Sequence, residues 1–161
     1  MKIHDTLRQC TARLTSCTDV PSLESELLLM HVLHCPRSDL HAWPETVLDH
    51  QTLQQIESLL LRRIAGEPLA YITGEREFWS LTLDITPDVL IPRPETELLV
   101  EQGLLRIPDS TRCCVADLGT GSGAIILAIA KERPLAQCIG TDHSAAALAV
   151  AANNAARHRL E

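Results

Sequence analysis

The sequence predicts an α/β protein in which a helical bundle is followed by a β-hairpin and the first part of a doubly wound parallel sheet. Three patterns support this fold class: helical spacing of apolar residues up to about residue 74, a period of two from 76 to 86, and a strand, a glycine-rich loop and an apolar helix between 115 and 130. We therefore expect a helical domain over residues 1–74, a hairpin linker over 75–90 and part of an α/β domain over 91–161.

The first 74 residues have the pattern of a small helical bundle. Apolar side chains of the first helix recur every three or four positions, at Ile3, Leu7, Cys10 and Leu14. Pro21 precedes a second helix, expected over residues 23–34, and a shorter helix is expected over 39–43. A third long helix is predicted from Thr52, because Thr52 and Gln55 have capping-box spacing.

The segment from residue 76 to 86 changes to the periodicity of a strand. Its apolar side chains alternate with polar ones, at Trp79, Leu81, Leu83 and Ile85. This predicts one half-buried strand that forms one arm of a hairpin. The next segment, residues 91–97, ends the extended structure and opens a helix that should continue to about residue 106, with Pro94 suited to its first position.

Composition excludes several classes of protein. The 161 residues are 45% hydrophobic and 22% charged, with a formal net charge of -7, so neither direct nucleic-acid binding nor attraction to an anionic membrane is expected. No apolar run approaches the roughly 20 residues of a membrane span, and residues 1–10 lack the apolar core of a signal peptide, so we expect a cytoplasmic protein. The six cysteines are scattered without a Cys-x-x-Cys pair, and we expect no metal site.

The segment Val-Ala-Asp-Leu-Gly-Thr-Gly-Ser-Gly at residues 115–123 carries the chemistry. It runs from a β-branched strand into the apolar helix that follows, which is the first unit of a Rossmann-like sheet. Gly119 permits the tight turn and Gly121 lets the backbone approach a ligand. Gly123 or Ala124 lets the helix pack close to the strand.

Asp142 follows a second predicted strand at residues 137–141, and Ser144 caps the alanine-rich helix after it. An acidic residue at the end of the second strand, roughly 20 residues past the glycines, accepts hydrogen bonds from ribose hydroxyls in such folds. The residues therefore predict a cofactor that contains adenosine. The glycines also fit the relaxed dinucleotide fingerprint, but Asp117 would repel a pyrophosphate and could meet an ammonium group, which favours S-adenosylmethionine.

Several segments together resemble one family. In order and spacing, residues 66–74 (Gly-Glu-Pro-Leu-Ala-Tyr-Ile-Thr-Gly), 77–81, 91–97 and 117–123 resemble the bacterial glutamine methyltransferases that modify peptide chain release factors. The resemblance implies that the helical domain recognises the release factor and that a hairpin links it to a seven-stranded methyltransferase domain. It also implies methyl transfer to the side-chain amide of the glutamine in a Gly-Gly-Gln tripeptide.

The resemblance also assigns roles to residues. It places S-adenosylmethionine on Gly119, Thr120, Gly121, Ser122 and Gly123, with Asp142 on the ribose, and the charge of Asp117 adds that residue to the cofactor residues. It brings a second set near the cofactor pocket: Pro92, Arg93, Glu95 and Glu97. The family's Asn-Pro-Pro-Tyr motif, which orients the glutamine amide, would fall after Glu161. We therefore assign no catalytic residue and expect a truncated domain that is inactive alone, with its two-stranded parallel sheet poorly ordered or self-associating.

Three other functions remain open from the sequence. The chain could be a non-catalytic module that binds a release factor through residues 1–74. It could instead belong to an adenine-N6 methyltransferase of nucleic acid, although its acidic charge argues against that. A nicotinamide-dependent oxidoreductase would also satisfy the glycine spacing.

Overall fold

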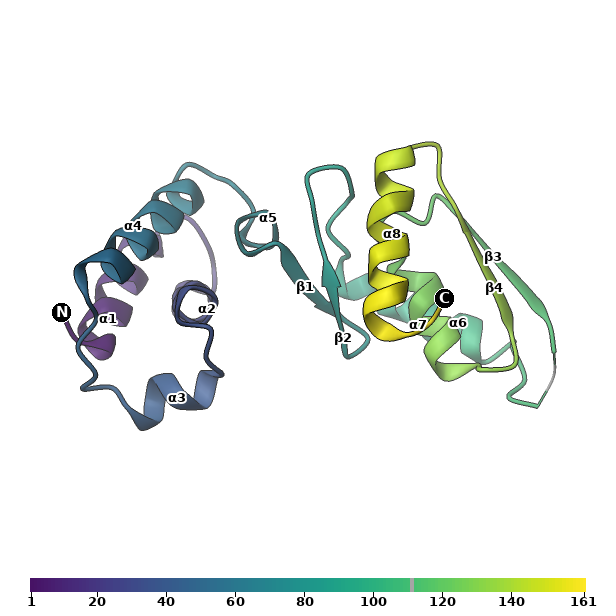
Figure 1. The fold of residues 1–161 in the computed structure, drawn as a ribbon, viewed down its shortest axis with the longest axis horizontal. Helices are drawn as coiled ribbons and strands as arrows, with labels where there is room; N and C mark the ends of the chain where they lie inside the picture. Colours follow the sequence, from purple (N-terminus) through teal and green to yellow (C-terminus); the bar gives the residue numbers. More distant parts are fainter. Residues whose placement is uncertain (111) are drawn as a thin grey trace. The chain divides into compact units, whose positions relative to one another are not determined.

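The computed structural model describes residues 1–110 and 112–161, which form two compact units, Met1–Thr73 and Gly74–Glu161 (Figure 1). The first unit is helical. The second contains an antiparallel hairpin and a parallel pair of strands with helices. The fold is therefore mixed α/β, as the sequence predicts, with an N-terminal helical domain, a hairpin and part of an α/β sheet.

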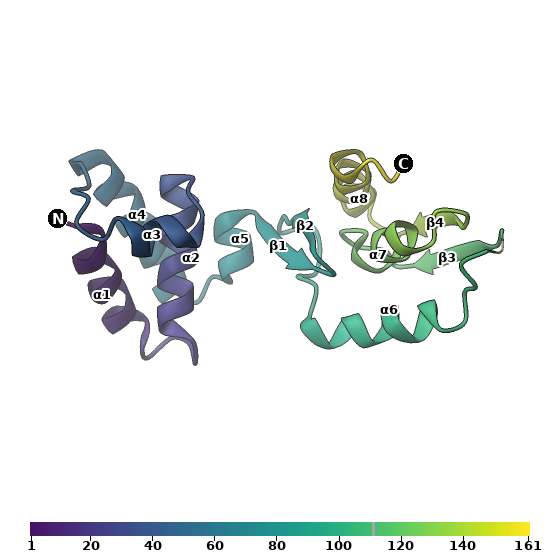
Figure 2. The same cartoon turned by 90° about the horizontal axis from the view of Figure 1, so that it is seen from below.

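The first unit contains α1 (Ile3–Leu14), α2 (Pro21–Leu33), α3 (Arg37–Ala42), α4 (His50–Ile64) and α5 (Leu69–Thr73) (Figure 2). Helices α1, α2 and α4 pack against one another around one apolar core. Its buried members are Ile3, Cys10, Leu14, Leu28, Leu29, Leu40, Leu48, Ile56, Leu60 and Ile72. The stripe predicted for α1 faces this core.

The start of α4 differs from the sequence prediction. Asp49, and not Thr52, caps the helix: the carboxylate of Asp49 accepts a hydrogen bond from the backbone N–H of Thr52 at 2.7 Å. The predicted capping box from Thr52 to Gln55 is wrong, because Thr52 already lies inside the first turn. An aspartate is at least as good a cap as a threonine. With Asp49 as the cap, the helix is about one turn longer at its N-terminus than a helix that begins at Thr52.

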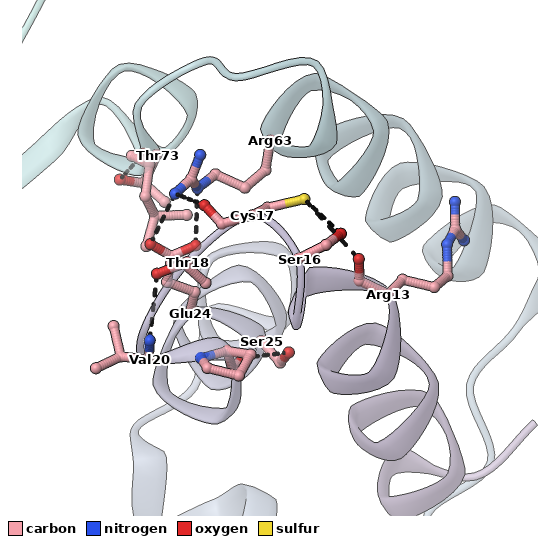
Figure 3. A network of polar contacts seen from close by, with 11 residues as sticks. Arg13, Ser16, Cys17, Thr18, Val20, Glu24, Ser25, Arg63 and Thr73 are labelled. Carbon is pink, nitrogen blue, oxygen red and sulfur yellow. Dashed lines mark hydrogen bonds and ion pairs between the residues drawn. The ribbon is translucent and has the colours of Figure 1, made fainter.

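A polar network joins three parts of the helical unit (Figure 3). The Nε of Arg63 on α4 donates to Oε2 of Glu24 on α2 at 2.7 Å, and its Nη2 donates to the carbonyl of Cys17 at 3.3 Å. Both charged side chains are largely buried, with 14% of Arg63 and 12% of Glu24 exposed. The pair therefore ties α4 to α2 and to the connection between α1 and α2.

The second unit opens with a tight hairpin of β1 (Glu75–Phe78) and β2 (Leu81–Asp84). Phe78 pairs with Leu81, so Trp79 and Ser80 alone form the turn, with φ of 52° and 55°. The sequence prediction of one arm over residues 76–86 is wrong, since this segment holds the turn and most of both arms. Because Trp79 in the turn is apolar, the alternation of apolar and polar residues continues through the turn, and the sequence pattern does not reveal where one strand ends and the next begins.

The rest of the unit supplies the parallel sheet. The helix predicted from Pro94 to about residue 106 is a 3₁₀ turn, η1 (Pro94–Thr96), followed by α6 (Glu97–Leu104). After it come β3 (Cys114–Leu118), α7 (Ala124–Glu132), β4 (Gln137–Thr141) and α8 (Ala145–His158). Strands β3 and β4 are parallel with Val115 opposite Cys138, and α7 packs against both of them.

The two faces of the parallel pair differ in exposure. Side chains on the face toward α7, such as Val115 and Cys138, are partly covered. Those on the opposite face are exposed, and Leu118 has 82% of its surface accessible. Parallel sheets are usually covered on both faces, so this pair shows only half of the usual layering.

Candidate cofactor site

The predicted cofactor residues gather at one edge of the parallel sheet. Residues 119–123 follow β3 and Asp142 follows β4, and the carboxyl ends of parallel strands meet at the same edge. The backbone N–H groups of Gly119 and Thr120 both donate to the carbonyl of Thr141 at 2.8 Å. The glycine loop is thereby fixed to the last residue of the neighbouring strand.

Three glycines of the loop have backbone conformations that other residues avoid. The φ angles are 83° at Gly119, 55° at Gly121 and 83° at Gly123. A Cβ atom at Gly119 or Gly121 would meet no atom within 4 Å, so both glycines border open space. A Cβ at Gly123 would lie 3.0 Å from Leu127 Cδ1 and 3.4 Å from Ala151 Cβ. Packing between the loop and the helices therefore depends on Gly123.

Asp142 links the glycine loop to the start of α8. Its Oδ1 accepts a hydrogen bond from the backbone N–H of Ser144 and its Oδ2 accepts one from Gly121, both at 2.9 Å. These two bonds, that of Ser144 first, lower the pKa of Asp142 below its ordinary value of 3.8. The carboxylate is therefore charged at neutral pH and has lone pairs left to accept hydrogen bonds from a ligand.

Asp117 near the end of β3 contacts Thr120 in the glycine loop. The hydroxyl of Thr120, a buried side chain, donates to Oδ2 of Asp117 at 2.8 Å. A Cβ at Gly140 would come within 3.0 Å of the Thr120 hydroxyl oxygen, so a glycine in β4 makes room for this side chain. Gly140 was not among the residues predicted from the sequence. A glycine inside a predicted strand was the available signal, because glycine there often marks a close approach.

Ser122 brings a further residue into the site. Its carbonyl accepts a hydrogen bond at 2.9 Å from Nδ2 of Asn154, a fully buried side chain on α8. Asn154 was not among the predicted residues either. Its position was detectable, since Ala147, Val150 and Asn154 share the helical spacing of the buried face of α8.

The four residues expected near the cofactor lie in the segment after the hairpin, which ends at Glu97, the first residue of α6. Pro92 is buried, Arg93 precedes η1 and is exposed, and Glu95 is exposed within η1. Glu97 has a defined partner: its Oε1 accepts a hydrogen bond from the backbone N–H of Trp79 at 2.9 Å. The structure thus connects Glu97 to the hairpin turn, and the proximity of all four residues to a bound cofactor stays a prediction.

Within residues 1–110 and 112–161, no group of three or more histidine, cysteine, aspartate and glutamate side chains is arranged to hold a metal ion. No helix in that part of the chain combines the length and apolarity needed to cross a bilayer.

Two family descriptions match the chain in separate stretches. Residues 5–74 match the PrmC N-terminal domain, and residues 109–161 match a methyltransferase domain. The second match includes β3, β4 and the glycine loop between β3 and α7.

Curated relatives match across both stretches. The chain is 47% identical over 161 residues to the release factor glutamine methyltransferase of Coxiella burnetii, covering 100% of this chain and 58% of the relative. It is 49% identical to that of Vibrio cholerae over 96% of this chain and 54% of the relative. For the enzyme of Escherichia coli the identity is 45%, over 96% of this chain and 55% of the relative. The chain thus spans a little over half the length of these relatives, and it belongs to the release factor glutamine methyltransferase family, whose N-terminal portion it matches.

Proposed function

We propose that these residues form the cofactor half of an S-adenosylmethionine-dependent protein-glutamine methyltransferase. The substrate is the glutamine side-chain amide in the Gly-Gly-Gln motif of a peptide chain release factor, encountered in the cytoplasm. The observation that carries the proposal is the contact between the Gly121 N–H and Asp142, which joins the glycine loop to the end of the second strand. Relatives of the same family, 45–49% identical, support it.

The chemistry of the site fits the proposed cofactor. Asp142 is charged and offers lone pairs to the ribose hydroxyls, and Asp117 offers a carboxylate to the ammonium group. The loop ends at the first turn of α7, where the helix dipole favours the carboxylate of the methionine moiety. When bound, S-adenosylmethionine supplies the methyl group on its sulfonium.

The residues of the first unit have a different role in this proposal. Helices of Met1–Thr73 recognise the release factor and bring its glutamine to the cofactor. The 161 residues contain no Asn-Pro-Pro-Tyr sequence. We therefore expect them alone to bind the cofactor and the release factor without turnover, since orientation of the amide accounts for about 7–11 kcal/mol of the barrier in well-positioned reactions.

Calorimetric titration with S-adenosylmethionine tests the cofactor assignment. We expect binding by the chain, at least about tenfold weaker binding by Asp142→Ala, as for loss of a charged hydrogen-bond acceptor, and no binding of NAD. Asp109→Ala is the matched control, because Asp109 is 84% exposed and pairs with Arg133. Equal affinities of the two variants would refute the role of Asp142, and selective binding of NAD would point to an oxidoreductase.

Mass spectrometry of a release factor tests the reaction. The release factor is incubated with S-adenosylmethionine and either this chain or, as positive control, the Coxiella burnetii enzyme. We expect a methylated Gly-Gly-Gln glutamine with the control enzyme and none with the 161 residues. Capture of the release factor without any binding of S-adenosylmethionine would instead support the non-catalytic binding module.

A further inference from the structure

The side chain of Asn154 uses both ends of its amide in the interior of the second unit. Its Oδ1 accepts a hydrogen bond from the backbone N–H of Asp84 at 2.6 Å, and its Nδ2 donates to the carbonyl of Asp84 at 3.1 Å. The same Nδ2 donates to the carbonyl of Ser122 at 2.9 Å. One fully buried amide thus joins α8 to the hairpin and to the glycine loop.

Two neighbours of Asn154 on α8 contact both strands of the same hairpin. Arg157 on α8 pairs with the side chain of Asp84 and, at 2.7 Å, with that of Glu75. One helical turn from Asn154, the Nε2 of His158 lies 2.8 Å from the carbonyl of Thr82. Because α8 is fixed to the hairpin at several points, the amide of Asn154 has a defined position relative to the loop.

Because the amide of Asn154 is buried, its hydrogen bonds favour one orientation of the Ser122 carbonyl in addition to connecting the segments. A buried carbonyl that loses its partner costs the desolvation energy of the group, so the loop favours the conformation in which the Ser122 carbonyl faces Asn154. That carbonyl lies between Gly121 and Gly123, the two glycines with positive φ that adjoin it. Fixing its direction therefore restricts the peptide planes on both sides.

We propose that Asn154 is a positioning residue for the cofactor loop: its amide holds the Ser122 carbonyl in the direction that keeps residues 121–123 in their binding conformation. This inference rests on the proposed binding of S-adenosylmethionine. It adds a residue outside the glycine motif, and through Asp84 it makes the hairpin part of the support of the site.

The variant Asn154→Asp tests the proposal because it keeps the shape and removes the donor. A carboxylate can accept from the Asp84 N–H but repels the carbonyls of Asp84 and Ser122. Protonation restores a donor, and burial beside two carbonyls favours the protonated form. At pH 8 we expect the Kd for S-adenosylhomocysteine to rise about tenfold, in line with one lost buried hydrogen bond, and to recover as the pH is lowered toward 5.

Asn153→Asp is the matched control, because Asn153 is the exposed neighbour on the same helix and undergoes the same chemical change. We expect this variant to follow the wild type at every pH, so the ratio of the two Kd values isolates the buried amide. Asn154→Ser lacks the titrating group and should bind more weakly without recovery at low pH. A residue that only stabilised the fold would not produce a pH dependence confined to Asn154→Asp.

Amide hydrogen exchange of the unliganded chain gives a second readout that needs no cofactor. We expect faster exchange at residues 121–123 in Asn154→Asp and Asn154→Ser than in Asn153→Asp, with exchange across α7 unchanged. The inference would be overturned if the ratio of the Kd values of Asn154→Asp and Asn153→Asp were the same at every pH and the exchange of the loop were unchanged. The proposed function would remain intact in that case. Failure of the wild type to bind S-adenosylhomocysteine would reject the proposed cofactor, and loop exchange would still decide whether Asn154 positions the loop.

Discussion

A polar contact of the helical unit and one of the second unit differ in chemical form. In the helical unit it is a largely buried charged pair, Glu24 with Arg63, which joins α2 to α4. In the second unit it is the neutral amide of Asn154, placed between a hairpin and a glycine loop. The Glu24–Arg63 pair thus connects two helices, whereas the amide of Asn154 connects a helix and the hairpin to the glycine loop.

The largest difference in stability is expected between alanine substitutions at two leucines. Leu28 is fully buried in the helical core and Leu118 is 82% exposed on the sheet. We expect Leu28→Ala to destabilise its unit by about 3 kcal/mol, through lost burial and a cavity, and Leu118→Ala to change stability by no more than about 0.5 kcal/mol. Urea unfolding followed by amide exchange in each unit measures both, and similar costs would mean that the exposed sheet face is covered in solution.

Alanine substitutions at two glycines distinguish the effect of backbone strain from that of ordinary helix packing. Gly123→Ala combines a positive φ with a contact of 3.0 Å to Leu127, so we expect a loss of about 2–3 kcal/mol together with loss of cofactor binding. Gly103→Ala lies in α6 at 3.6 Å from Ile129 and should be neutral or stabilising by up to about 1 kcal/mol. Calorimetric melting and titration of both variants test this. Full cofactor affinity in Gly123→Ala would contradict the loop geometry.

The next largest expected effect on stability concerns the Glu24–Arg63 pair of the helical unit. Glu24→Gln leaves the buried Arg63 with a weakened partner, and we expect a loss of about 2 kcal/mol in residues 1–73. Its control is Glu67→Gln, which changes a solvent-exposed pair with Arg62 and should alter stability little. Neither variant should change cofactor affinity. A weakened affinity in Glu24→Gln would break the distinction between the two units.

The smallest effect concerns two aspartates with matching roles. Backbone N–H groups lower the pKa of Asp49 and of Asp142 below 3.8. The ionised forms are thus favoured by folding, so each stabilising contribution is present above pH 3.8 and is lost as the pH falls through the lower folded pKa. We expect Asp49→Asn to reduce this acid sensitivity in residues 1–73 and Asp142→Asn to reduce it in 74–161. Amide exchange between pH 2 and 5 distinguishes this from a uniform response.

Regular elements were predictable because each has a short-range signal. The apolar stripe of α1 and the strand, loop and helix at residues 114–132 follow from periodicity and glycine spacing alone. Cap assignment failed at Asp49 because two polar residues three positions apart, Asp49 and Thr52, are both plausible caps by residue type.

The hairpin turn and the partners of Asn154 were not predictable for a different reason. Trp79 and Ser80 lack the glycine or asparagine that marks a two-residue turn, and their left-handed conformation is held by groups distant in sequence. The backbone N–H of Trp79 donates to Glu97, and the backbone carbonyl of Trp79 accepts a hydrogen bond from Lys131 at 3.2 Å. Likewise, the partners of Asn154 lie 32 and 70 residues away along the chain. Long-range contacts of this kind leave little local trace.

The hairpin turn also gives the chain an intrinsic optical reporter. The indole Nε1 of Trp79 donates to Glu132 at 3.0 Å, so the emission of this ring depends on the contact between the turn and the end of α7. The chain has two tryptophans, and the other, Trp43, is 68% exposed in the helical unit. In a Trp43→Phe chain all tryptophan emission would therefore come from the hairpin, and changes there on ligand binding could be followed in real time without an added label.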